Sequence, residues 1–237
     1  MSTHDSSAVF AALAAELQLE PDEALTSRAI VTRMRELVPE ADHVSLTIRT
    51  SRDGHKTLAS SAAVAAEADA LQYELGEGPC LEIADTGGWL RSGSVGTDPR
   101  WPQWGPRADG LGVRSLLSVA VTDREEPLGA LNLYSAEPSS FADRDVVDLA
   151  LVYAVHATTA LSSARRASTL QTAVSSRHVI GMAQGIAMER YGIDQHQSFE
   201  LLRRLSSTTN VKLRDVAAQI VETRTIPQER AGTAVDD

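Results

Sequence analysis

The chain has 237 residues with 22 basic and 32 acidic side chains, and 43% of its residues are hydrophobic, which is typical of a folded globular protein. Its apolar runs are too short for a membrane-spanning helix, and residues 1–20 lack the basic start of a secretory signal. A single cysteine, Cys80, excludes an intramolecular disulfide framework and a cysteine-cluster zinc site. We therefore expect a cytoplasmic protein of one large or two modest domains.

The net charge of −10 conceals an asymmetry along the chain. Residues 1–164 carry 12 basic and 24 acidic groups, whereas residues 165–225 carry nine basic and five acidic groups. A charge that changes sign along a chain favours two modules with different partners. The basic segment is compatible with nucleic-acid binding, although its positive excess is modest and the abundance of arginine equally fits genomic base composition.

The first half of the chain predicts helices and short strands. Segments with apolar residues at helical spacing, or with strong helix formers, are 1–21, 22–37 and 62–75. Segments with the alternation of half-buried strands are 43–49, 57–60, 115–121 and 128–134. The turn residues at 51–54 and the charged turn at 123–127 are short enough for hairpins, which favours an antiparallel sheet with helices packed on it.

Two longer segments follow different rules. The segment 76–111 is rich in glycine and proline and contains all three tryptophans, so it reads as a long loop. Ser140 and Asp143 form a capping-box pattern that predicts a helix from Phe141. Helical propensity then persists to Tyr191, far longer than a single domain requires, so this helix is expected to connect two domains.

The connecting helix also carries a heptad rhythm. Its members are Leu149, Tyr153, His156, Ala160, Ser163, Ala167, Leu170 and Val174. Because the middle of the stripe is weak, a short parallel coiled coil and a plain linker helix both remain open.

The end of the chain predicts a small helical unit. Asp194 is expected to cap one helix, the segment 206–210 to end it, and a third helix to start near Val211. Gly181 and Gly185 are interpreted as sites of close helix packing, since glycine costs about 1 kcal/mol in a helix.

Three sequence segments in this unit form a specific pattern: VIGMAQGIAMER at 179–190, SFELLR at 198–203 and KLRDVA at 212–217. This pattern closely resembles the ANTAR domain, an RNA-binding three-helix module of bacterial antiterminators. LGEGPC at 75–80 and LGALNL at 128–133, with RWP at 100–102 and GVRS at 112–115, resemble a GAF domain of the kind joined to ANTAR in actinobacteria.

The resemblance implies an α+β fold with a GAF-like antiparallel sheet flanked by helices, a long connecting helix and an all-α three-helix bundle. We divide the chain into an N-terminal helix, a GAF-like sensor, an ANTAR domain and a flexible tail. Their bounds are 1–21, 22–163, 164–225 and 226–237.

The resemblance also implies a partner. ANTAR proteins are described as dimers that bind pairs of small hairpins in a leader transcript, and hairpin loops present unpaired bases and phosphates to polar side chains. The residues expected to contact RNA are Arg177, Gln184, Arg190, Arg203, Arg204, Asn210, Lys212 and Arg214. Gln184 departs from the lysine found in many ANTAR domains. Tyr191 is interpreted as a core plug rather than as a residue that stacks on a base.

The first half offers a candidate ligand pocket. Its proposed lining is Tyr73, Cys80, Trp89, Trp101, Trp104 and Arg114. The aromatic residues could equally form a roof over the sheet. The six histidines show no metal-ligand spacing, no catalytic constellation is legible, and Cys80 lacks a resolving thiol, so we expect no metal, no identified cofactor and no enzyme activity.

We therefore expect a signal-responsive regulator that binds structured RNA. Its GAF half is expected to sense an unknown ligand or partner. Two copies are expected to form a homodimer through the connecting helix. Three alternatives stay open. One is a DNA-binding helix-turn-helix factor, disfavoured by the long 206–210 connection. Another is a GAF-centred small-molecule binding protein without RNA activity. The third is a protein–protein adaptor with a degenerate ANTAR half. Neither a membrane nor DNA is an expected partner.

Overall fold

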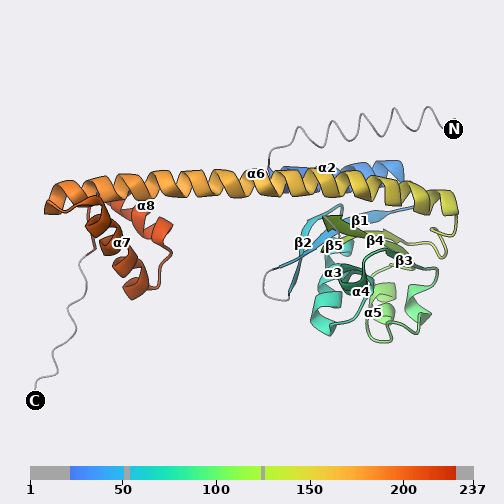
Figure 1. The fold of residues 1–237 in the computed structure, drawn as a ribbon. Helices are drawn as coiled ribbons and strands as arrows, with labels where there is room; N and C mark the ends of the chain where they lie inside the picture. The colour runs from blue at the N-terminus through green and yellow to red at the C-terminus, as the bar shows by residue number, and fades with distance from the viewer. Residues whose placement is uncertain (1–21, 51–53, 124–125, 228–237) are drawn as a thin grey trace, which may run out of the picture. The chain divides into compact units, whose positions relative to one another are not determined.

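The computed structural model describes residues 22–50, 54–123 and 126–227 (Figure 1). The chain divides into two compact units, Met1–Ser168 and Thr169–Asp237. The helix expected within 1–21, part of the 51–54 turn and most of the expected tail lie outside the described residues.

The first unit contains a five-stranded antiparallel sheet of order β2-β1-β5-β4-β3. Its strands are β1 (His43–Arg49), β2 (His55–Ser60), β3 (Trp89–Ser92), β4 (Ser115–Asp123) and β5 (Glu126–Ser135). The predicted antiparallel sheet is thus confirmed. The pairs β1–β2 and β4–β5 are consecutive in the chain, whereas the 3-10 turn and α5 lie between β3 and β4. The central β5 pairs with β1 so that Leu46 lies opposite Leu131.

Helices cover both faces of the sheet (Figure 1). On one face lie α2 (Glu23–Leu37) and the first part of α6 (Arg144–Tyr191); on the other lie α3 (Ala63–Leu75), α4 (Pro79–Thr86) and α5 (Trp104–Gly110). Strand β1 is consequently buried on both faces from Val44 to Ile48, so the prediction of a half-buried strand is wrong. Its polar residues Ser45 and Thr47 are fully buried.

The segment 76–111 is not the predicted loop. It holds α4, β3, a 3-10 turn at Val95–Thr97 and α5. Gly76, with φ 63°, ends α3 in the left-handed conformation that glycine tolerates best, and Pro79 begins α4 at a position where its missing N–H costs nothing.

Helix α6 is as long as the sequence predicts, with 48 residues, but it begins at Arg144 rather than at Phe141. The carboxylate of Asp143 accepts a hydrogen bond from the backbone N–H of Asp145 at 3.0 Å. Ser140, the predicted cap, instead bonds the hydroxyl of Ser135 and the carbonyl of Glu137. The capping-box pattern therefore predicted the start of the helix three residues too early, because Ser140 belongs to the preceding turn.

The heptad stripe of α6 divides into two parts. Tyr153 and Ala160 are buried against the sheet, whereas Leu170 and Val174 are 67% and 66% exposed. One window of α6 has a mean hydropathy of 1.4, which by length and composition alone would allow a membrane span, but 50% of that window is buried inside the structure. This is the pattern of a core helix covering a sheet.

The second unit packs the end of α6 against α7 (Gln195–Thr209) and α8 (Leu213–Thr223). Its buried core consists of Ala183, Ala187, Leu202, Leu205, Val216, Ala217, Ile220 and Ile226. Asp194 caps α7 as predicted, in a reciprocal capping box with Gln197. Ile226, placed in the tail by the sequence, belongs to this core.

Helix α7 continues to Thr209, through most of the segment 206–210 that was expected to end it. Asn210, at φ 54°, closes the helix, and only Asn210, Val211 and Lys212 connect α7 to α8. The length of this connection therefore no longer disfavours a helix-turn-helix.

Candidate functional site

A buried polar network lies between the sheet and α3 of the first unit. Asp69, on α3, is fully buried. Its carboxyl group accepts hydrogen bonds from the Tyr134 hydroxyl at 2.6 Å, the Thr57 hydroxyl at 2.8 Å and the Asn132 amide at 3.2 Å. The Thr47 hydroxyl adds a fourth at 3.3 Å. One carboxyl group thus joins α3 to β1, β2 and β5.

The network extends to the start of α4. Gln72 donates to the Tyr134 hydroxyl at 3.2 Å and accepts from the backbone N–H of Cys80 at 2.8 Å. The Tyr73 hydroxyl lies 2.8 Å from the Thr47 hydroxyl and 2.9 Å from that of Thr57. The sequence offered one signal for this site, since Asp69 and Gln72 follow Ala65 and Ala68 on the buried face of α3.

Burial controls the acid–base state of this network. It raises the pKa of Asp69, while the hydrogen bond from Tyr134 acts in the opposite direction. Burial also raises the pKa of Cys80 well above its usual value, and nearby Asp69 adds to that effect. A thiol of this kind is a poor nucleophile, so the network is suited to holding the fold rather than to covalent chemistry.

The six residues of the predicted ligand pocket lie in different parts of the first unit. Cys80, Trp101 and Trp104 belong to the core beneath the sheet, where Trp104 is fully buried and donates its indole N–H to the Ala68 carbonyl at 2.9 Å. Trp101 meets Trp104 edge to face, with ring centroids 5.6 Å apart. These two tryptophans pack against one face of the sheet, as expected if they cover it rather than line a pocket.

The remaining pocket candidates lie elsewhere. Tyr73 packs against the same core with its hydroxyl in the network. Trp89 packs against the core on the other face of the sheet. Arg114 is exposed. Their separation has a simple cause: Trp89 is on β3 and packs on one face of the sheet, whereas Trp104, at the start of α5, and Trp101, three residues before it, pack on the opposite face.

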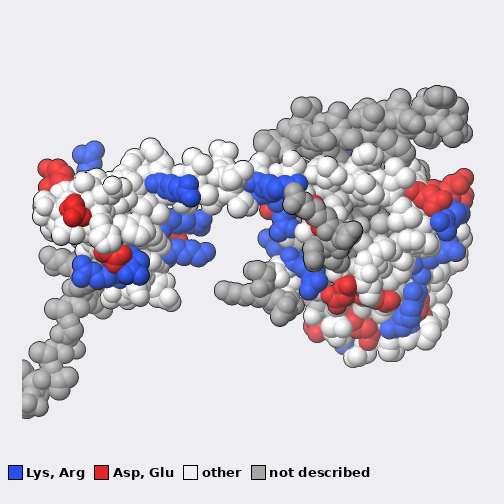
Figure 2. All heavy atoms as spheres, viewed as in Figure 1, with Lys and Arg blue, Asp and Glu red and all other residues white. Residues whose placement is uncertain are grey.

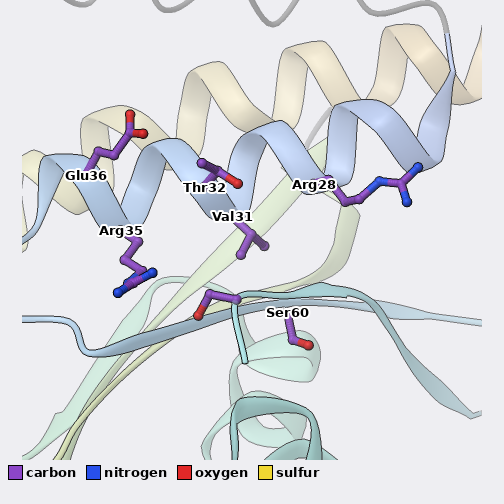
Figure 3. Close-up of a pocket in the computed structure, with 7 residues that line it drawn as sticks. Arg28, Val31, Thr32, Arg35, Glu36 and Ser60 are labelled. Atoms are coloured by element: carbon purple, nitrogen blue, oxygen red, sulfur yellow. The ribbon is translucent and has the colours of Figure 1, made fainter. Parts of the chain in front are cut away.

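A groove of the first unit runs between α2 and the end of β2, with a volume of about 480 Å³ (Figure 3). In this view Val31 points into the groove, Arg35 extends toward the strands and Arg28 extends along the helix. None of the six predicted pocket residues lines it.

In the second unit, several predicted RNA contacts are engaged within the chain. Arg203 forms an ion pair with Glu200 at 2.7 Å, three residues away on the same helix. Arg214 pairs with Asp215 at 3.1 Å. Arg190 donates to the backbone carbonyl of Arg224 at 2.9 Å and so ties α6 to the end of α8. Figure 2 shows basic side chains at separate places on this unit with acidic ones between them.

Gln184 and Asn210 have structural partners. The Gln184 amide donates to the Gln195 carbonyl at 3.1 Å, which holds α6 against the start of α7. The backbone of Asn210 closes α7 in the left-handed conformation. By contrast, Arg177, Arg204 and Lys212 are exposed, and within the described part of the chain no ion pair engages them.

Two interpretations of this unit are corrected. Tyr191 is 52% exposed and is therefore not a core plug. A Cβ atom built on Gly181 or Gly185 would meet no described atom within 4 Å outside the local helix backbone, so these glycines do not serve close packing within the chain.

Comparison with known families decides what the two units are. The GAF domain family matches residues 20–162, and the ANTAR domain family matches residues 168–221. The chain belongs to the GAF domain family and carries an ANTAR domain. A GAF domain is a sensory domain and an ANTAR domain indicates an RNA-binding antitermination regulator, so both units are regulatory rather than catalytic. The chain matches no curated protein.

Solved structures agree on the fold of the GAF domain. A GAF domain of a phosphoenolpyruvate-protein phosphotransferase from Coxiella burnetii is 18% identical with a TM-score of 0.53, over 68% of this chain and 95% of that one. The corresponding domain from Acinetobacter is 13% identical with a TM-score of 0.55, over 71% and 99%. A free methionine-R-sulfoxide reductase from Neisseria meningitidis is 16% identical with a TM-score of 0.53, over 67% and 89%.

These similarities extend to fold alone. The reductase was solved in complex with its substrate. In this chain the single cysteine, Cys80, is buried. Among the described residues, no group of three or more His, Cys, Asp or Glu side chains is placed to hold a metal ion.

Proposed function

We propose that the protein is a cytoplasmic, signal-responsive regulator whose ANTAR domain binds paired hairpins in leader RNA. Binding would control transcription antitermination or access to a ribosome-binding site. The match of the ANTAR family to a folded three-helix unit carries this proposal. The exposed cations Arg177, Arg204 and Lys212 support it, because exposed guanidinium and ammonium groups that form no ion pair with a described residue are available to phosphates.

A salt-titrated filter-binding assay tests the proposal. It compares a two-hairpin RNA selected from a genomic RNA library, one hairpin of that RNA, and duplex DNA. We expect preference for the paired hairpins and an affinity that falls with salt, because phosphate contacts release counterions. Equal weak binding to all three, or failure of the selection to enrich any RNA, would contradict RNA recognition.

Preference for duplex DNA would favour the helix-turn-helix alternative. The connection of three residues between α7 and α8 is compatible with that motif, which is why duplex DNA belongs in the same assay.

We further propose that two copies pair through α6. Leu170 and Val174 are four residues apart, at consecutive core positions of the heptad pattern, and both are exposed in the single chain. Leu170→Glu with Val174→Glu is expected to convert a dimer to a monomer in analytical ultracentrifugation. Thr172→Glu with Ser175→Glu, on the outer side of the same turn, is the control and leaves the dimer unchanged. A monomeric wild type, or a dimer unaffected by the first pair, argues against this interface.

The signal received by the GAF domain is proposed to reach RNA through α6, because this one helix contributes to the cores of both units. A small ligand of the GAF domain would be detected by a change in tryptophan fluorescence, since Trp101 and Trp104 lie in its core. A glycine-rich insertion at Ser168 is expected to uncouple ligand from RNA affinity. Signalling that survives the insertion would remove the helix from the mechanism.

A further inference from the structure

A shallow pocket of about 370 Å³ lies between the end of α6 and α7 of the ANTAR domain. It is lined by Tyr191, Ile193, Gln197, Leu201 and Arg204, and we refer to it as the Tyr191 pocket. Residues 197, 201 and 204 follow helical spacing and so lie on one side of α7, next to the residues that end α6. The position of both helix ends is visible in Figure 1.

The Tyr191 ring is the unusual member of this pocket. Tyr134 and Tyr153 are fully buried, and the Tyr73 hydroxyl is bonded inside the GAF domain, whereas Tyr191 is 52% exposed. The exposed part of this aromatic ring is apolar surface that is available for a ligand to cover.

The local backbone holds this ring in place. Gly192, at φ 62°, ends α6 with its N–H bonded to the Met188 carbonyl at 2.9 Å. Two residues later, Asp194 and Gln197 form the capping box of α7. The ring is therefore attached to a short junction whose backbone is held between two helices. Binding of a ligand to the ring would cost little backbone entropy.

The polar groups of the pocket are available to a ligand. The Gln197 side-chain oxygen accepts the backbone N–H of Asp194 at 3.0 Å, so its amide nitrogen keeps its two donor hydrogens. Arg204 forms no ion pair with any described residue, although its neighbour Arg203 is held by Glu200 at 2.7 Å. The pocket thus combines an aromatic face, an apolar floor at Ile193 and Leu201, an amide donor and a positive charge.

We propose that the Tyr191 pocket binds one unpaired nucleobase of the RNA, stacked on the Tyr191 ring, with its edge at Gln197 and its adjacent phosphate at Arg204. The proposal rests on the RNA-binding function above. An unpaired base is the ligand that fits, because it has a flat π face, hydrogen-bond acceptors on its edge and a negative phosphate attached.

Four variants of the full-length protein test the site by filter binding to the selected two-hairpin RNA. Tyr191→Ala is expected to weaken binding about 5- to 100-fold with an unchanged salt dependence, because stacking is not ionic. Tyr191→Phe keeps the ring and stays within about twofold of the wild type. Arg204→Ala is expected to reduce the log–log salt slope by about one. Arg203→Ala, the matched control, changes the slope less because Glu200 already engages that charge.

The outcomes separate the two proposals. If the wild type binds no RNA, the proposed function fails and the base site fails with it. If the wild type binds RNA and Tyr191→Ala binds equally well, only the base site is overturned.

A second readout does not depend on affinity. With ring-labelled tyrosine, the selected RNA is expected to shift the Tyr191 ring resonances upfield in NMR spectra, while those of buried Tyr134 and Tyr153 stay in place. The Tyr191→Phe spectrum assigns the resonance. An RNA complex in which the Tyr191 signals do not move contradicts stacking.

Discussion

The hydroxyl group of Tyr134 donates a 2.6 Å hydrogen bond to the carboxyl group of Asp69, and both side chains are fully buried. The other groups that donate hydrogen bonds to this carboxyl group, on Thr47, Thr57 and Asn132, are also neutral. Neutral donors compensate only part of the cost of burying a negative charge, which is why the pKa of Asp69 is raised.

Asp69 is therefore expected to make the GAF domain less stable as pH rises. Below about pH 4 the carboxyl group is protonated in both folded and unfolded chains. Above that pH the unfolded chain ionises first, so the free energy of unfolding falls by up to about 1.4 kcal/mol per pH unit until the folded pKa is passed. Urea denaturation of the wild type and Asp69→Asn between pH 4 and pH 8 measures this as a difference. A difference that is constant, or that grows in favour of the wild type with pH, would contradict it.

The pair of Asp98 and Arg100 predicts the opposite pH dependence. A bidentate hydrogen bond from Arg100, 2.6 Å at its shorter contact, lowers the pKa of Asp98 to about 2. The stabilisation is present above about pH 4 and is lost as pH falls toward 2. Asp98→Asn should lower the free energy of unfolding by about 1 to 2 kcal/mol at pH 7, and the difference should vanish in acid. Equal stabilities at pH 7 would show that the pair is energetically neutral.

Gly129→Ala is expected to destabilise the GAF domain by at least about 2 kcal/mol. Gly129 lies on β5, and a Cβ atom there would overlap the carbonyl oxygen of Thr47 on β1. Because the obstacle is backbone, no side chain can move to relieve it. Thermal unfolding followed by circular dichroism measures the loss. Gly110→Ala, where a Cβ atom meets nothing within 4 Å, is the control, and an equal effect of both would refute the steric argument.

Gly181→Ala and Gly185→Ala are expected to stabilise α6, by about 0.5 to 1 kcal/mol each, because alanine is the better helix former and the space around both Cβ positions is open. The RNA affinity and the sedimentation coefficient of these variants are measured as well. Reduced RNA affinity or loss of dimer despite higher stability would mean that a second molecule approaches these glycines closely. Lower stability would contradict the open environment.

Gln184→Lys tests the departure from the common ANTAR residue. It introduces one cation and should steepen the log–log salt slope of RNA binding by up to about one. Gln184→Ala removes the hydrogen bond to the Gln195 carbonyl and should lower the free energy of unfolding by about 1 kcal/mol without changing that slope. A slope that Gln184→Lys leaves unchanged would place residue 184 away from phosphate.

Local patterns predicted the long elements of this fold. The helices ending at Leu37, Leu75 and Tyr191 and the hairpin strands follow from periodicity and glycine stops, which act within a few residues. The pieces of 76–111 were missed because they are short and depend on neighbours. Strand β3, for example, has four residues and exists by pairing with the edge of β4.

The candidate sites divide in the same way. The basic residues of the ANTAR domain were identified from the sequence, but which of two adjacent arginines is engaged depends on Glu200, whose carboxylate meets Arg203. The exposure of Tyr191 depends on where α6 ends and α7 begins. The Asp69 network was not predicted because it assembles from α3 and three strands, and only one helix-face pattern pointed to it.

Helix α6 has a practical consequence for anyone who divides this protein. The chain passes from the GAF match to the ANTAR match, between residues 162 and 168, inside a continuous helix. A fragment that starts there begins with four backbone N–H groups lacking intrahelical acceptors, and its first turns will fray. Its affinity for RNA would then include the free energy of rewinding those turns. A fragment that starts after an added Ser or Asp cap would separate recognition from refolding.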